Sequence, residues 1–170
     1  KSPSQHFFWY PMARKPKSLM AQIKTMALRW PNFKPKLGRY PHTIIWNGQL
    51  TGLERAFTLS IEYGSQLADS NQLCRNMPVV RVLFPKLVMN FAAEEEAPLP
   101  HVYFEGPDYT LSPLCLFDPQ TGEWNRTMYI ADTIVPWAAR WLACYELWET
   151  TGRWYGGGRH ADFKENTDVA

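Results

Sequence analysis

The stretch Leu114–Pro119, which reads Leu-Cys-Leu-Phe-Asp-Pro, places Cys115 between two apolar residues and just ahead of an Asp-Pro turn. A cysteine acts as a nucleophile when its thiolate is accessible, and a loop gives more access than a core. The same pattern is typical of a half-buried structural cysteine. The stretch alone leaves both interpretations open, so the patterns on either side of it have to decide between them.

The composition predicts one well-packed domain. The 170 residues are enough for a single full-sized core, and a hydrophobic fraction of 45% with eight tryptophans argues against general disorder. The formal net charge of +2 gives a weak electrostatic case for nucleic acid, so we expect no nucleic-acid partner. No apolar run approaches the roughly 18 residues of a membrane-spanning helix, and we expect a soluble protein without a membrane partner.

The three cysteines, Cys74, Cys115 and Cys144, cannot all pair within one chain, and none forms a Cys-x-x-Cys motif. The N-terminus mixes basic, proline and aromatic residues and does not look like a secretory signal. We therefore expect a reducing, cytoplasmic location without a disulfide framework. The histidines and cysteines lack paired spacing, which argues against a metal site. Cys74 is expected to be a surface thiol and Cys144 a packed residue.

The first helix is predicted over Leu19–Trp30. Ser18 is suited to its N-cap, and Pro31 ends the pattern. Apolar residues recur at the spacing of one helix face, which predicts an amphipathic helix laid on a sheet. The residues expected on that face are Met20, Ile23, Ala27 and Trp30, with Gln22 outside it.

Three strands are predicted next, at His42–Trp46, Ala56–Tyr63 and Val79–Phe84. β-Branched residues favour the first, Asn47-Gly48 then offers a turn, and the other two alternate in polarity. A helix followed by consecutive strands predicts an α+β fold, in which an antiparallel meander carries a helix on one face. The residues expected on the inner face are Phe57, Leu59, Ile61 and Tyr63 in the second strand, and Val80, Val82 and Phe84 in the third.

A long tryptophan-rich helix is predicted over Ile134–Thr150. Asp132 or Thr133 is suited to cap its N-terminus, and Gly152 suits its C-terminal end. Aromatic residues recur at helical spacing, which indicates a stripe packed on the sheet and not a ligand-binding box. The stripe consists of Ile134, Trp137, Trp141, Tyr145 and Trp148.

The chain divides into an extended N-terminal arm over residues 1–17, one domain over residues 18–160 and a polar tail over residues 161–170. His101 lies in a long loop ahead of Cys115, where it serves as a general base or as a residue that orders the loop. A cysteine hydrolase stays open on residue types alone, although the chain carries no signature of a Cys-His protease. His42 and His160 are expected to be exposed.

The order of helix, meander, cysteine loop and long helix resembles the ubiquitin-conjugating-enzyme fold. The fit is sharper with prokaryotic members, the stand-alone conjugating components of bacterial CBASS antiphage systems, and it covers about Ser18 to His160. The motifs that carry it are Pro-His-Val-Tyr at 100–103, the Leu-Cys-Leu stretch at 114–119, Ala-Asp-Thr-Ile-Val-Pro-Trp at 131–137, the Trp-rich run at 141–148 and Thr-Gly-Arg-Trp at 151–154.

This resemblance implies a cysteine thioester carrier. Cys115 would accept the C-terminal carboxyl of a partner protein, a CBASS cyclic-oligonucleotide synthase (CD-NTase), and transfer it to an amine or hold it. Neither a metal nor an organic cofactor is implied. The alternative is a non-catalytic interaction module that binds and regulates the nucleotidyltransferase, with an inert cysteine.

One triplet departs from the eukaryotic pattern. Those enzymes carry His-Pro-Asn before the cysteine, with the asparagine credited with oxyanion stabilisation or loop support, and here the equivalent residues are His101-Val102-Tyr103. The resemblance implies that the Tyr103 hydroxyl takes the place of that asparagine as a donor to the oxyanion. It also implies that Asp118 orients or deprotonates an incoming lysine, or else caps the following turn.

Overall fold

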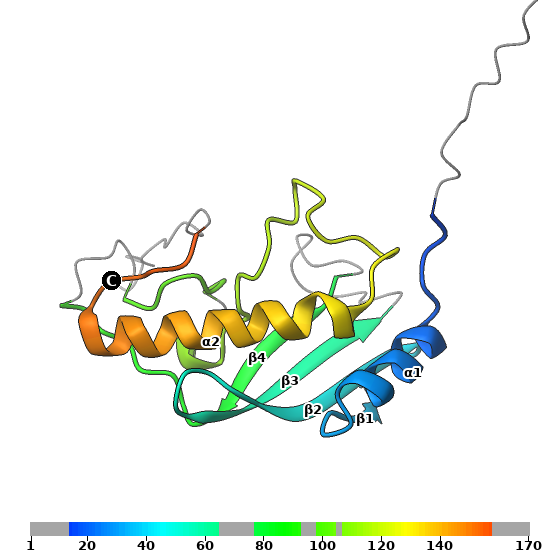
Figure 1. The fold of residues 1–170 in the computed structure, drawn as a ribbon, viewed down its shortest axis with the longest axis horizontal. Helices are drawn as coiled ribbons and strands as arrows, with labels where there is room; N and C mark the ends of the chain where they lie inside the picture. The colour runs from blue at the N-terminus through cyan, green and yellow to red at the C-terminus, as the bar shows by residue number, and fades with distance from the viewer. Residues whose placement is uncertain (1–13, 65–76, 93–97, 105–106, 158–170) are drawn as a thin grey trace, which may run out of the picture.

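The computed structural model describes residues 14–64, 77–92, 98–104 and 107–157. A first helix precedes a four-stranded antiparallel sheet, and a long second helix then crosses the sheet (Figure 1). The predicted α+β class and the order of its elements are confirmed. The elements are α1 (Leu19–Arg29), β1 (Lys34–Leu37), β2 (Thr43–Thr51), β3 (Ala56–Gly64), β4 (Val79–Phe84), the short 3-10 helices η2 (Tyr109–Leu111) and η3 (Ile130–Asp132), and α2 (Ile134–Thr151).

The sheet is a meander in the order β1-β2-β3-β4, and each neighbouring pair is antiparallel. The longest pairing joins β2 to β3, from Thr43 opposite Gly64 to Thr51 opposite Ala56. Sequence patterns do not predict β1, because its Lys-Pro-Lys-Leu sequence is short, charged and interrupted by proline. All four of its residues are exposed, which is typical of an edge strand that discourages pairing with another chain.

The predicted turn at Asn47-Gly48 is wrong, because both residues lie inside β2 and pair with β3. A Cβ atom on Gly48 would stand 2.4 Å from the ring of Phe33, a buried side chain just before β1. The glycine therefore permits a close approach between a strand and an aromatic ring. The hairpin turns later, between Thr51 and Ala56.

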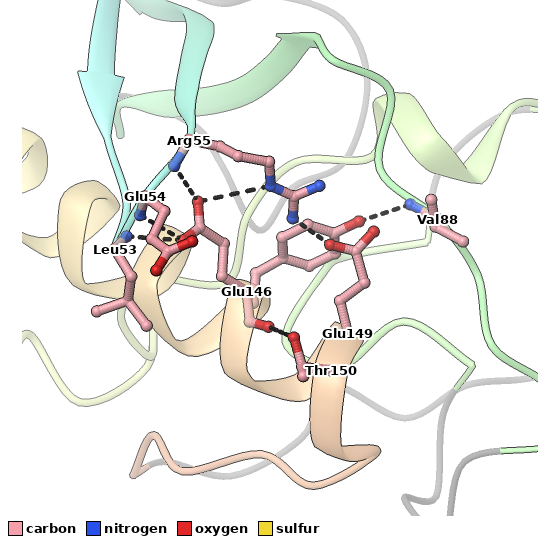
Figure 2. A network of polar contacts seen from close by, with 8 residues as sticks. Leu53, Glu54, Arg55, Val88, Glu146, Glu149 and Thr150 are labelled. Carbon is pink, nitrogen blue, oxygen red and sulfur yellow. Dashed lines mark hydrogen bonds and ion pairs between the residues drawn. The ribbon is translucent and has the colours of Figure 1, made fainter.

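This β2–β3 turn is fastened to α2 by one carboxylate, as Figure 2 shows. Glu146, with 8% of its side chain exposed, accepts backbone N–H bonds from Leu53 (2.8 Å), Glu54 (2.8 Å) and Arg55 (2.9 Å). Burial raises the pKa of the Glu146 carboxyl, but these hydrogen bonds and the Arg55 guanidinium outweigh it, so the pKa lies below its usual value. Arg55 pairs with Glu149 as well, which extends the link along the helix.

β4 changes phase at its end. Val80 and Val82 are buried as predicted, but Phe84 is 70% exposed, so its predicted place on the inner face is wrong. A register shift places Phe84 opposite Thr58, while Val82 lies opposite the residue after Thr58. One extra residue in β4 therefore moves the following side chain to the other face of the sheet. The predicted inner residues of β3 are all buried, namely Phe57, Leu59, Ile61 and Tyr63.

α1 begins at its predicted N-cap, where the Ser18 hydroxyl accepts a hydrogen bond from the Ala21 N–H at 3.1 Å. The predicted inner face of this helix is right for Ile23 and Trp30, which pack against the core, and wrong for Met20 and Ala27, which are exposed. Met20 is 58% exposed, whereas the buried residues are Gln22 and Met26. The helix is therefore rotated away from the orientation that apolar spacing alone predicts.

Gln22 explains this rotation. Its amide donates to the Met128 carbonyl at 2.9 Å and accepts from the Ile130 N–H at 2.9 Å, so both ends of the group are satisfied beside η3. An unpaired polar side chain is costly to bury, but an amide that bonds two backbone groups avoids this cost. Tertiary hydrogen bonds thus decide which face of α1 points inward.

α2 matches its prediction to within one residue. It ends at Gly152, which adopts the left-handed conformation at φ 72° and donates its N–H to the Trp148 carbonyl at 2.7 Å. Thr133 is the N-cap, but its hydroxyl donates to the Tyr129 carbonyl at 2.7 Å and makes no capping bond. Trp137 is only partly buried. The other residues of the predicted stripe, Ile134, Trp141, Tyr145 and Trp148, are buried, and so is Cys144.

Several predictions concern residues outside the described ranges, namely Cys74, His160, residues 1–13 of the arm and the tail. His42 is exposed, as predicted. Across the described part of the chain, neither helix combines the length and the apolar character needed to cross a membrane.

Candidate functional site

Two loop segments meet at the outer edge of β4 and hold the candidate cysteine. Val102 and Leu114 form an isolated antiparallel bridge. The Leu114 N–H also donates to the Val80 carbonyl of β4 at 2.9 Å. Cys115 directly follows this anchored residue, so its backbone is tied to the sheet although it lies in a loop.

His101 orders the loop through its backbone carbonyl. That oxygen accepts from the Cys115 N–H at 2.9 Å and from the Trp141 indole N–H of α2 at 2.9 Å. His101 has φ 53°, a left-handed conformation that residues with a side chain rarely adopt. Its imidazole is buried and stacks on Trp154, with ring centroids 4.8 Å apart and an interplanar angle of 26°.

Tyr103 brings a hydroxyl to the thiol. Its backbone N–H donates to the Pro113 carbonyl at 2.8 Å, which fixes the residue across the loop. Its hydroxyl donates to the Phe117 carbonyl at 3.1 Å and is also hydrogen-bonded to the Cys115 side chain. One phenol therefore lies between the sulfur and a carbonyl two residues further on.

The Cys115 thiol is partly buried, and its pKa is raised. Burial is the main cause, because it disfavours the charged thiolate. The Tyr103 hydroxyl lowers the pKa, because its single proton can turn from the Phe117 carbonyl to a thiolate, while the negative charges of Asp118 and Glu123 raise it further. At neutral pH the free protein therefore holds this group mostly as the thiol.

Asp118 shapes the turn behind the cysteine. Its carboxylate accepts the Gln120 N–H at 2.8 Å, and its carbonyl accepts the Thr121 hydroxyl at 3.0 Å. Its own N–H donates to the Glu123 carboxylate at 2.9 Å. The turn cap expected of Asp118 is thus present, and it places two carboxylates near the thiol. A role of Asp118 toward an incoming lysine stays a prediction.

The structure brings all four predicted site residues together, but in unequal ways. Tyr103 and Asp118 act on the electrostatics of the Cys115 thiol, whereas His101 acts on its backbone. Sequence reasoning missed three further residues at the site. Glu123 lies in a polar turn that carries no motif. Trp141 and Trp154 look like ordinary core aromatics in the sequence. The one available signal is that a buried indole N–H needs a hydrogen-bond acceptor.

An apolar hollow adjoins the cysteine loop. It is bordered by both residues that flank Cys115 and contains the Tyr103 ring. Its other lining residues are Met77, Pro78, Val79, Pro113, Phe117 and Pro119.

These features define a class of protein: an α+β domain of the ubiquitin-conjugating-enzyme-like type, with a cysteine loop between a β-meander and a long helix. A family model described as Type II CBASS E2 protein matches residues 22–161. The chain belongs to this family, which places it among the E2-like proteins of CBASS antiviral defence. A comparison with curated proteins gives no match.

Proposed function

We propose that Cys115 carries a thioester to the C-terminal carboxyl of a partner protein, the CD-NTase of the CBASS system. The observation that carries this proposal is the Tyr103 hydroxyl, which is hydrogen-bonded to the Cys115 side chain beside a loop tied to the sheet. In the first step the sulfur attacks an activated carbonyl carbon, the C–S bond forms, the bond to the leaving group breaks and the thiol proton passes to the leaving group. In the second step an amine attacks, the C–N bond forms, the C–S bond breaks and a proton of the amine passes to the sulfur, which restores the thiol.

The oxyanion of each step needs a hydrogen-bond donor. The backbone N–H of a nucleophile often serves this purpose, but the Cys115 N–H is already bonded to the His101 carbonyl at 2.9 Å. The Tyr103 hydroxyl is a second donor beside the sulfur. It needs only to turn its proton from the Phe117 carbonyl, 3.1 Å away, toward the developing oxyanion.

The charges near the thiol suit the second substrate. Asp118 and Glu123 both disfavour a negative charge on Cys115. They would attract the ammonium group of a lysine and would repel a free carboxylate. We therefore expect the donor carboxyl to arrive in an activated, uncharged form.

The interaction module remains the second candidate, and the burial of Cys115 favours it. A desolvated thiol with a raised pKa is a weak nucleophile in the free protein, as a structural cysteine is. In this function the chain would bind and regulate the CD-NTase without a covalent step.

Co-expression with the complete operon tests the two candidates. We expect a chain–CD-NTase adduct on non-reducing gels that a thiol removes, that is absent in Cys115→Ala and that resists the thiol in Cys115→Ser. Cys144→Ala, which removes a buried cysteine of α2, should leave the adduct unchanged. If the wild type and Cys115→Ala bind and regulate the CD-NTase equally and no adduct forms, the thioester carrier is wrong and the interaction module is supported.

A further inference from the structure

The segment that follows α2 folds back over the cysteine loop. Gly152 ends the helix in the left-handed conformation, and the chain reverses beyond it (Figure 1). Two residues later, the Trp154 indole stacks on the His101 imidazole at 4.8 Å and contacts the Trp141 ring at 5.6 Å. The end of the described chain therefore touches the residue that receives the Cys115 N–H bond.

A glycine holds the outer side of this indole. A Cβ atom on Gly156 would stand 2.4 Å from the Trp154 indole nitrogen, so the backbone at this position packs directly on the ring. A Cβ atom on Gly157, the next residue, would meet no atom within 4 Å. Trp154 is thus enclosed between the returning chain and His101, while its neighbour Tyr155 is 56% exposed.

The clamped residue has an unusual backbone. Residues with a side chain seldom adopt φ 53°, so contacts made by the side chain and the carbonyl of His101 help to hold it there. These contacts are the stacked Trp154 ring on its side chain and the Trp141 indole N–H on its carbonyl. The same carbonyl accepts the Cys115 N–H, so the conformation of His101 sets the direction of the cysteine backbone.

We propose that Trp154 is a positioning residue for Cys115, which clamps His101 and thereby holds the cysteine loop in its reactive geometry. This inference rests on the proposed thioester chemistry for its consequence in transfer. Trp154 is only partly buried and packs against the margin of the core, so its removal acts on the loop before it acts on the fold.

Two variants perturb the clamp in different ways, and two others serve as matched controls. Trp154→Ala removes the indole, and Gly156→Ala displaces it through the added Cβ atom. Tyr155→Ala and Gly157→Ala change exposed or open positions of the same segment. Trp154→Phe keeps a ring for stacking and should behave nearly like the wild type.

The first readout is single-turnover formation of the thioester with the CD-NTase. We expect Trp154→Ala and Gly156→Ala to lower the maximal rate on the order of tenfold or more, because small misplacements of a reacting group are costly. The concentration of CD-NTase at half-maximal rate should stay within about twofold, since a positioning residue acts on the chemical step and not on binding.

The second readout is alkylation of Cys115 by iodoacetamide, followed on the Cys115 peptide by mass spectrometry across a pH series. A released loop exposes the thiol, so we expect faster alkylation and a profile moved to lower pH, opposite in direction to the transfer rate. Urea denaturation of each variant should show a cooperative unfolding transition, which means that every variant is folded.

The outcomes separate the two proposals. If Trp154→Ala forms the thioester at the wild-type rate and its alkylation profile is unchanged, the clamp is refuted. It is also refuted if the changes in transfer rate and alkylation merely follow the fraction of unfolded protein. If the wild type forms no thioester, the proposed function fails. The alkylation profiles of Trp154→Ala and Gly156→Ala against their two controls would still decide whether Trp154 positions Cys115.

Discussion

Replacing Glu146 by glutamine should weaken the link between α2 and the β2–β3 turn. The carboxylate accepts three backbone N–H groups on its two oxygens at 2.8–2.9 Å and has 8% of its side chain exposed. Glutamine keeps the shape but has one acceptor oxygen, and its NH₂ group must then face an N–H donor. One hydrogen bond is lost, and the others lose the contribution of an ionised acceptor.

Hydrogen bonds to charged groups contribute about 1.5–3 kcal/mol each, against about 0.5–1.5 kcal/mol for neutral ones. We therefore expect Glu146→Gln to lower the free energy of unfolding by about 2–4 kcal/mol at pH 7. For a protein of this size that corresponds to a melting temperature roughly 5–15 °C lower. Glu149→Gln is the matched control. Its carboxylate is more exposed and has side-chain partners, Arg55 and Tyr145, in place of backbone N–H groups, so its loss should cost about 0.5 kcal/mol.

The pH dependence supplies a second test with a defined sign. The pKa of Glu146 is lowered in the folded protein relative to its usual value of 4.5. Its stabilisation is therefore complete above that value and disappears as the pH falls through the folded pKa. Urea denaturation monitored by tryptophan fluorescence at pH 7, 5, 4 and 3 should show the difference between wild type and Glu146→Gln shrinking toward low pH. Equal effects of the two variants at pH 7, or a difference that persists unchanged at pH 3, would refute this account of the network.

Three further variants test the site and the sheet. Tyr103→Phe should slow thioester formation on the order of a hundredfold and move the alkylation profile of Cys115 to higher pH, because it removes the hydrogen bond that lowers the thiol pKa; an unchanged rate would exclude Tyr103 as the oxyanion donor. Asp118→Asn removes a negative charge that raises the pKa of Cys115, so the alkylation profile should move to lower pH. A shift to higher pH would contradict this effect of the Asp118 charge. Gly48→Ala places a Cβ atom 2.4 Å from the Phe33 ring and should lower the free energy of unfolding by about 1–3 kcal/mol; calorimetry showing no loss would mean that the ring moves aside freely.

Local patterns predict well where a residue's environment depends mainly on its own neighbours in the chain. The alternation of β3 places Phe57, Leu59 and Ile61 on the inner face, and all three are buried. Ser18 and Gly152 mark the ends of the two helices because capping needs only a hydroxyl in one case and a left-handed residue in the other.

The same patterns fail where a distant contact overrides them. Apolar spacing points Met20 inward, but Met20 is exposed and the buried position is taken by Gln22, whose side chain makes two hydrogen bonds. Asn47-Gly48 has the composition of a turn, yet it lies within a strand, where the missing side chain of Gly48 makes room for the Phe33 ring. A register shift at the end of β4 exposes Phe84, and the alternation of polar and apolar residues gives no sign of that shift.

Patterns along the chain are enough to predict the α+β order of elements and to place Cys115 in a loop between the meander and the long helix, because polarity periods, caps and motif spacing are local properties. The surroundings of the thiol depend instead on contacts between distant segments. The bond from the Cys115 N–H to the left-handed His101, the hydroxyl of Tyr103 and the Trp154 clamp all join segments that are separate in sequence. The pKa and geometry of a cysteine depend on such neighbours in space, and those neighbours are set by the fold.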